Sequence, residues 1–185
     1  MVGATVMLIV TIPVSLANGA AAGLMHLLFV ACALAYNLGL KSTAISWLPY
    51  AVAFGALPSF VTLGTTGTWA PWWATVATAL LGVGAHLANV VPDLADDLAT
   101  GVRGWPQRLG PYARLLAPIP LAAATILLVV APPGPVGLIG WIVLAVVAAL
   151  LTIILTWKNA PFLVTIAVAA VSVAALVIRG DALVP

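Results

Sequence analysis

Charged residues are scarce in this sequence. Six of its 185 residues are Lys or Arg and four are Asp, so charged side chains make up 5% of the chain. An ordinary soluble domain has roughly 25% charged residues, and so few charges cannot cover a globule of this size in water. A water-soluble fold is therefore excluded. The basic residues are also too few to form the clustered basic face that nucleic-acid binding requires, so we expect no nucleic-acid partner.

Cysteine is limited to Cys32. Because a single cysteine cannot pair within the chain, the sequence contains no disulfide framework. Its position inside an apolar run predicts a small, buried hydrophobic side chain. No basic residue precedes the first apolar run, so we expect no cleavable signal and predict that the membrane segments themselves direct the chain to the membrane.

Hydrophobic residues, in contrast, make up 64% of the chain, and the mean hydropathy is +1.25. Helix-breaking residues (Gly and Pro) and polar residues divide the sequence into seven apolar stretches, approximately 3–17, 20–36, 44–63, 70–91, 112–131, 136–156 and 160–178. Most of them reach the ~20 residues that a helix needs to cross ~30 Å of hydrocarbon, whereas the first, of about 15, is short. We predict an all-α fold, a polytopic transmembrane bundle of about seven helices in which residues 1–185 form a single integral membrane domain.

The basic residues predict an orientation for this bundle. If the crossings alternate, five basic residues fall on one side, namely Lys41, Arg103, Arg108, Arg114 and Lys158. By the positive-inside rule this side is cytoplasmic, and the N-terminus with it, whereas the C-terminus with Arg179 and Asp181 is outside. Several tryptophans near the predicted helix ends, Trp157 among them, are interpreted as interfacial anchors. The Ala, Val, Gly and Trp bias is typical of GC-rich bacterial genomes, so we expect a bacterial inner (plasma) membrane.

Three of the four carboxylates lie within residues 86–97, which read His-Leu-Ala-Asn-Val-Val-Pro-Asp-Leu-Ala-Asp-Asp. If this segment is helical, four side chains fall within roughly 60° of one another on one face, namely His86, Asn89, Asp93 and Asp97. Pro92 removes a helical hydrogen bond, so we predict a kink or a helix end there, which a membrane protein tolerates where it lines a polar cavity. His86, deeper in the segment, is expected to make a hydrogen bond between helices.

Asp93 and Asp97 have the spacing of a shared cation site. Carboxylates four residues apart on a helix have Cβ atoms ~6 Å apart and repel each other unless a cation lies between them. Mg²⁺ prefers hard oxygen ligands and typically uses one or two carboxylates together with phosphate oxygens. We predict that this pair binds a diphosphate through Mg²⁺, with Asn89 as a further ligand or a residue that orients water. The alternative is a solvated loop, in which Asp96 faces solvent or pairs with Arg103.

These residues resemble a known family. Residues 89–110 read Asn-Val-Val-Pro-Asp-Leu-Ala-Asp-Asp-Leu-Ala-Thr-Gly-Val-Arg-Gly-Trp-Pro-Gln-Arg-Leu-Gly. This run resembles the second aspartate motif of the UbiA superfamily of intramembrane prenyltransferases. Upstream, residues 36–41 read Tyr-Asn-Leu-Gly-Leu-Lys, which resembles the Tyr and Lys segment that follows an earlier helix in this family. The resemblance covers most of the chain.

The resemblance implies a bundle of about nine transmembrane helices around a cavity that opens to lipid near the cytoplasmic face. It implies transfer of an isoprenyl group from an isoprenyl diphosphate to a hydrophobic, often aromatic, acceptor in the bilayer, with Mg²⁺ as cofactor. Asp93 and Asp97 would be the metal ligands and, with Lys41, the catalytic residues. The implied diphosphate-binding residues are Lys41, Tyr36, Asn89, Arg103 and Arg108. The basic residues among them also fit the positive-inside rule without any role in binding.

The sequence departs from the family in one respect. The family's earlier motif, Asn-Asp-x-x-Asp-x-x-x-Asp, occurs nowhere in these 185 residues, and no acidic residue precedes Asp93. In the family this motif lies between the second and third helices, so we expect the chain to correspond to helices three to nine and to be N-terminally truncated. We therefore expect this chain alone to be inactive or weakly active, and its uncovered helix surface to favour oligomers.

Two other classes of membrane protein remain open. CDP-alcohol phosphatidyltransferases also bind metal through aspartates on helices, but their motif requires a glycine at the position of Asp97 and a later aspartate pair that does not follow here. A non-catalytic protein, such as a transporter or channel subunit or an inactive remnant, would use an ionisable patch inside the bundle as an ion or proton route.

Overall fold

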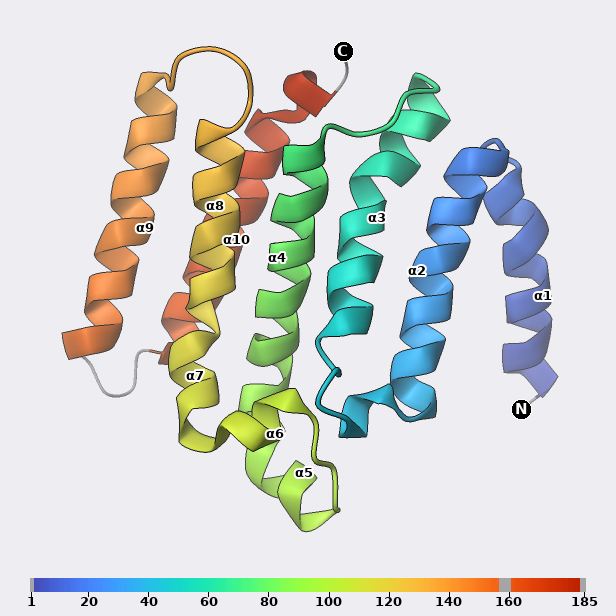
Figure 1. The fold of residues 1–185 in the computed structure, drawn as a ribbon, viewed down its shortest axis with the longest axis horizontal. Coiled ribbons are helices and arrows are strands. Elements are labelled where there is room, and N and C mark those ends of the chain that lie inside the picture. Colours follow the sequence, from blue (N-terminus) through green and yellow to red (C-terminus); the bar gives the residue numbers. More distant parts are fainter. Residues whose placement is uncertain (1, 157–160, 184–185) are drawn as a thin grey trace.

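The computed structural model describes residues 2–156 and 161–183, and this part of the chain is helical, with no strand (Figure 1). Its long helices are α1 (Val2–Leu16), α2 (Ala20–Leu38), α3 (Leu48–Thr65), α4 (Trp72–Val90), α8 (Pro118–Val130), α9 (Leu138–Thr156) and α10 (Pro161–Ile178). Three short helices connect α4 to α8, namely α5 (Leu94–Ala99), α6 (Trp105–Leu109) and α7 (Ala113–Leu116). The predicted all-α fold is confirmed.

Tight turns let neighbouring long helices run side by side. The turn between α1 and α2 contains Gly19, with a φ of 96°, and the turn between α3 and α4 contains Gly67, with a φ of 72°. Glycine adopts this left-handed backbone without steric cost, whereas other residues rarely do. The chain therefore reverses direction within a few residues at both places, as Figure 1 shows.

α4 lies in the middle of the bundle and packs against α3 on one side and against α8 and α10 on the other. Small residues allow this close approach. A Cβ on Gly82 would collide with the Tyr50 carbonyl oxygen of α3, and a Cβ on Gly84 would collide with the Leu121 side chain of α8. The core beside them is apolar, and Trp73, Leu81, Leu121 and Leu128 are among its buried members.

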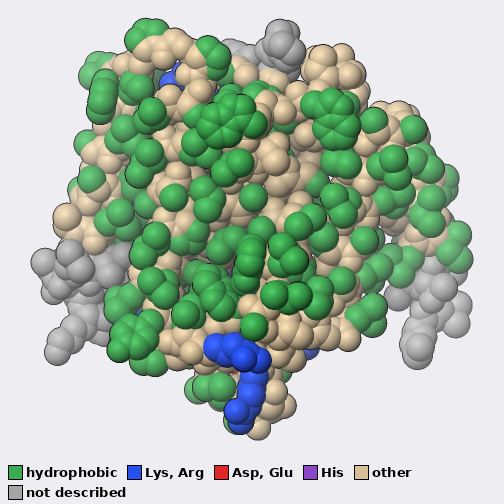
Figure 2. Space-filling view, in the orientation of Figure 1, with side chains coloured by type: hydrophobic (Ala, Val, Ile, Leu, Met, Phe, Trp, Pro, Cys, Tyr) green, Lys and Arg blue, Asp and Glu red, His purple; other side chains and the backbone are tan. Residues whose placement is uncertain are grey.

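The apolar helices correspond to the seven predicted stretches. Three segments are long and apolar enough to cross a membrane, namely Ala20–Leu38, Leu48–Thr65 and Trp72–Ala99. Trp105–Leu116 and Pro118–Val130 make a fourth if the bent pair is one span, and Met7–Leu16, Leu138–Ile153 and Phe162–Ile178 are shorter apolar helices. Hydrophobic side chains cover most of the surface in Figure 2. The chain is an integral membrane protein.

The stretch 112–131 differs from the single straight helix that its hydropathy suggests. It is divided between α7 and α8, and the helical segments on either side of the break are bent by 57°. Pro118 and Pro120 have no N–H to donate to the carbonyl groups of Arg114 and Leu116, so the hydrogen bonds that would keep the helix straight are missing.

The connections alternate between the two ends of the bundle (Figure 1). The linker between α2 and α3 (residues 39–47) lies at the same end as residues 91–117, and we call this the aspartate end. The connections α1–α2, α3–α4 and α8–α9 lie at the opposite end. Four of the predicted cytoplasmic basic residues belong to the aspartate end, namely Lys41, Arg103, Arg108 and Arg114, whereas Trp157 and Lys158 lie outside the described residues. The cytoplasmic location of this end stays a prediction.

Candidate functional site

The aspartates lie where α4 passes into a shorter helix. α4 ends at Val90, residues 91–93 form a 3-10 turn, and α5 begins at Leu94. Pro92 cannot donate a hydrogen bond to the Ala88 carbonyl, so the regular helical pattern is interrupted there. The helix end predicted at Pro92 is confirmed. Despite the turn, α4 and α5 together form the 28-residue segment Trp72–Ala99.

Asp97 is held by a residue from the loop that follows it. Its Oδ2 atom accepts a hydrogen bond from Nε2 of Gln107, with a distance of 2.7 Å. The chain can return to Asp97 because Gly101, two residues beyond the end of α5, has a φ of 85°, and the N–H of Val102 donates to the Asp97 carbonyl at 2.8 Å. A glycine in the left-handed region is a common way to end a helix. The short helix α6 then places Gln107 beside α5.

Asp93 and Asp96 are both exposed, and neither side chain forms an ion pair or a hydrogen bond with another described residue. Of the two positions expected for Asp96, the structure therefore has the solvent-facing one and not the pair with Arg103. Asp93 lies at the end of the 3-10 turn, four residues before Asp97. Both of its carboxylate oxygens are available to a ligand.

Ser46 joins three segments at the aspartate end. It is fully buried, its Oγ atom accepts a hydrogen bond from the backbone N–H of Trp105 at 2.9 Å, and it lies 3.0 Å from Nε2 of His86. Beside it, Gly104 packs so closely against the Lys41 carbonyl oxygen that a Cβ would not fit. These contacts hold the loop after the aspartates against the linker that contains Lys41. His86 does make a hydrogen bond, but its partner Ser46 lies in the linker between α2 and α3, so the expected bond between two helices is not what the structure has.

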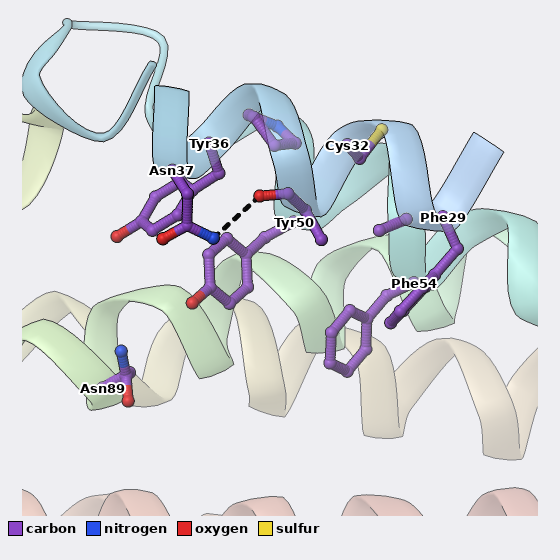
Figure 3. A pocket seen from close by; sticks show the side chains of 10 residues that line it. Phe29, Cys32, Tyr36, Asn37, Tyr50, Phe54 and Asn89 are labelled. Atoms are coloured by element: carbon purple, nitrogen blue, oxygen red, sulfur yellow. Dashed lines mark hydrogen bonds between the residues drawn. The ribbon is translucent and has the colours of Figure 1, made fainter. Parts of the chain in front are cut away.

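A cavity of about 380 Å³ lies between α2, α3 and α4, and we call it the aromatic pocket (Figure 3). Its lining residues are Phe29, Cys32, Ala33, Tyr36, Asn37, Pro49, Tyr50, Ala53, Phe54 and Asn89. Figure 3 shows Tyr36, Asn37, Tyr50 and Asn89 toward one end of it and Phe29 and Phe54 toward the other. The pocket is therefore more polar where it approaches the aspartates and apolar deeper in the bundle.

Contacts between rings fix the polar end of this pocket. The rings of Tyr36 and Tyr50 meet edge to face with centroids 5.2 Å apart, and both contact the His86 ring, at 5.7 Å and 4.8 Å. Edge-to-face and tilted arrangements at such distances are favourable for aromatic pairs. His86 itself is 1% exposed, and its Nδ1 atom has no hydrogen-bond partner among the described residues. Both tyrosine rings thus pack against the buried ring of His86.

The basic residues lie around the same end. Lys41, Arg103 and Arg108 are exposed, and Lys and Arg side chains gather at the lower end of the surface in Figure 2. Nε of Arg108 donates a hydrogen bond to the carbonyl oxygen of Arg103 at 3.0 Å, which closes the loop between them. Both side chains are exposed, so an anion can reach their guanidinium groups.

The structure brings most of the proposed site residues to one end of the bundle. Tyr36 and Asn89 face the same pocket, and Lys41 is tied to the loop of Arg103 and Arg108 through Gly104. The sequence analysis did not identify several neighbours of these residues, namely Ser46, Tyr50, Phe29, Phe54 and Gln107. Gln107 lies within the run 89–110 that contains the aspartates, and an uncharged polar residue among apolar and basic neighbours is a signal that could have identified it.

The donor set at the aspartates fits Mg²⁺. Asp93 offers two carboxylate oxygens, Asp97 offers Oδ1, and Asn89 lies one turn earlier with its amide exposed. These are hard oxygen donors in the number that Mg²⁺ takes from protein when phosphate oxygens and water complete its shell. The described residues contain no group of three or more His, Cys, Asp or Glu side chains that could hold a metal.

Comparison with known proteins gives one result. A model described as the UbiA prenyltransferase family matches residues 1–172, a range that includes the aspartates, the aromatic pocket and the linker with Lys41. No curated protein and no solved structure matches the chain.

Proposed function

The chain belongs to the UbiA prenyltransferase family, and on this basis we propose that it acts in Mg²⁺-dependent transfer of an isoprenyl group from an isoprenyl diphosphate to a hydrophobic, often aromatic, acceptor within the membrane. The observation that supports this most directly is that Asp93 and Asp97 follow, four and eight residues later on the same helical segment, Asn89 at the polar end of the aromatic pocket. A diphosphate at the carboxylates would have its hydrocarbon chain beside apolar walls.

In this proposal Asp93 and Asp97 hold Mg²⁺, and Asn89 orients a ligand at the pocket mouth. Bound Mg²⁺ would neutralise charge on the diphosphate as it leaves. Three cationic side chains at the same end, Lys41, Arg103 and Arg108, are proposed to bind the remaining diphosphate oxygens, since guanidinium groups form paired hydrogen bonds with phosphate and lysine supplies a point charge.

The aromatic pocket is proposed to hold the isoprenyl chain and to exclude water. As the C–O bond to the diphosphate breaks, positive charge develops on the allylic carbons, and the faces of Tyr36 and Tyr50 attract such charge. Phe29 and Phe54 lie deeper and offer only apolar surface to the hydrocarbon. A dry pocket also protects the cation from capture by water before the acceptor reacts.

These 185 residues offer few carboxylates for this chemistry. Besides Asp93 and Asp97, the sequence contains only Asp96 and Asp181. A diphosphate beside a single aspartate pair would be incompletely neutralised. We therefore propose that this chain by itself binds an isoprenyl diphosphate but transfers the isoprenyl group weakly or not at all.

Binding of an isoprenyl diphosphate to the purified protein tests the proposal. We expect binding that requires Mg²⁺ and is lost in Asp93→Asn, because removing one charge from the pair weakens its hold on the cation. Asp96→Asn is the matched control, since Asp96 is exposed, lies on the same segment three residues before its end at Ala99, and is not a proposed ligand; this variant should bind as the wild type does. Binding that is independent of Mg²⁺, or unaffected by Asp93→Asn, would favour a non-catalytic membrane protein instead.

A further inference from the structure

Gln107 is a buried amide of which only half is used. Its side chain is 7% exposed, its Nε2 atom donates to Oδ2 of Asp97 at 2.7 Å, and its Oε1 atom has no hydrogen-bond partner among the described residues. A buried polar atom without a partner lowers stability, and an apolar side chain of similar length would avoid this. Apolar packing therefore does not explain a glutamine here, whereas its hydrogen bond to Asp97 does.

The orientation of this amide follows from the chemistry of its partner. An ionised carboxylate can only accept hydrogen bonds, so the NH₂ group of Gln107 must face Asp97. Turning the amide over would place two oxygens against each other. Oδ2 of Asp97 is consequently occupied by Gln107, whereas Oδ1 has no hydrogen-bond partner in the described part of the chain.

Gln107 belongs to a part of the loop that is itself fixed. Two residues before it, the Trp105 N–H is bound to the buried hydroxyl of Ser46, and Gly104 packs against the Lys41 carbonyl. α6 is therefore attached to the linker between α2 and α3 and to α4, not only to α5. It follows that Gln107 sets the position of the Asp97 carboxylate and does not simply follow it.

We propose that Gln107 is a positioning residue that keeps Asp97 a one-oxygen ligand and thereby makes the Asp93–Asp97 site prefer Mg²⁺ to Ca²⁺. This inference rests on the proposed function, in which these aspartates bind the metal. Mg²⁺ requires a compact octahedral shell, whereas the larger Ca²⁺ takes six to eight oxygens and accepts both oxygens of one carboxylate. With Oδ2 bound to Gln107, the two-oxygen arrangement that suits Ca²⁺ is blocked at Asp97.

The test measures displacement of Mn²⁺ from the full chain in detergent, with inorganic pyrophosphate present and Mn²⁺ followed by electron paramagnetic resonance. In Gln107→Met, which keeps the length but cannot donate, we expect the Mg²⁺-to-Ca²⁺ affinity ratio, with each affinity obtained from displacement of Mn²⁺, to fall about tenfold, the size of effect typical of residues that orient metal ligands. Displacement by Ca²⁺ should be unchanged or stronger. Leu109→Met is the matched control on the same helix, and its Mg²⁺-to-Ca²⁺ ratio should equal that of the wild type.

The possible results separate this inference from the function on which it rests. If the wild type binds no Mn²⁺ with pyrophosphate, both are wrong. If it binds Mn²⁺ but Gln107→Met weakens Mg²⁺ and Ca²⁺ equally, or changes neither, the inference about Gln107 alone is overturned. Gln107→Leu provides a second variant if the methionine form does not fold, because an apolar side chain cannot donate to Asp97 and adds no charge or metal ligand; the ratio should again fall.

Discussion

At the scale of single residues, the aspartate end depends on uncharged polar side chains. Ser46 accepts a hydrogen bond from Trp105 and contacts His86, and so connects three segments that are distant in the sequence. Asp93, Asp96 and the basic residues around it are exposed, whereas Asp97 is half-buried and accepts a hydrogen bond from Gln107. The geometry of the charged site is therefore determined mainly by neutral groups behind it.

We predict that Ser46→Ala destabilises the protein by about 1–3 kcal/mol, because the buried N–H of Trp105 would lose its acceptor. This can be checked by measuring the free energy of unfolding in mixed micelles as the fraction of a denaturing detergent is increased. Ser42→Ala, an exposed serine in the same linker, is the control and should change stability by less than about 0.5 kcal/mol. Equal stability of the two variants would show that the Ser46 contact contributes nothing.

The residues that the sequence could predict at this scale are those related by helical periodicity. Asn89, Asp93 and Asp97 lie four positions apart from one to the next, so their common face follows from local geometry. The contacts of Ser46 with Trp105, 59 positions away, and of Gln107 with Asp97 across a loop depend on how α6 folds back. Neither hydropathy nor periodicity contains that information.

At the scale of elements, α3 and α4 are held close together by the absence of a side chain. A Cβ at Gly82 would lie 2.9 Å from Cβ of Phe54 and would also collide with the Tyr50 carbonyl oxygen. Both contacts are on α3, directly behind the wall of the aromatic pocket. The distance between these two helices and the shape of the pocket are therefore linked.

We predict that Gly82→Ala destabilises the protein by about 1–3 kcal/mol, the usual cost of adding a group to a well-packed interior. Gly64→Ala is the matched control inside α3, where a Cβ would meet its neighbours only at 3.8 Å or more. Because alanine favours helix more than glycine does, that variant should be neutral or more stable by up to about 1 kcal/mol. The same unfolding measurement applies. A Gly82→Ala protein as stable as the wild type would mean that α3 and α4 can move apart without loss of stability.

Element boundaries were predictable from composition, and element shape was not. The positions of α1 to α4 follow from apolar stretches separated by Gly, Asn and Pro, which interrupt helices for local reasons. The bend before α8 was not predicted, because mean hydropathy does not distinguish Pro118 and Pro120 from other residues of an apolar stretch. Their missing N–H groups nevertheless break the helical hydrogen-bond pattern.

At the scale of the whole molecule, the connections place the aspartates, the linker with Lys41 and most described basic residues at one end. We predict that this end faces the cytoplasm of a bacterial cell. In a Cys32→Ala background, a membrane-impermeant maleimide added to intact cells should label Pro133→Cys, in the connection between α8 and α9. It should label Ala99→Cys, at the end of α5, only after permeabilisation.

The opposite labelling pattern would contradict the predicted orientation. Labelling of both positions in intact cells would show that the cells are leaky, and a known cytoplasmic protein serves as the control for leakage. The Cys32→Ala protein without an added cysteine should not be labelled and serves as the control for background. Both cysteines would stand at exposed positions, so a difference in labelling reports the side of the membrane and not burial in the fold.

The length of the segment Trp72–Ala99 fixes the depth at which the protein meets its ligand. Asp93 is 21 residues beyond Trp72, or about 32 Å along a helix at 1.5 Å per residue, which is close to the ~30 Å thickness of the hydrocarbon. The carboxylates would thus stand level with the phospholipid headgroups while the aromatic pocket lies among the acyl chains. An amphiphile dissolved in the same leaflet already holds its diphosphate and its tail at these two levels, so it can reach the site by lateral diffusion, without leaving the bilayer or reorienting.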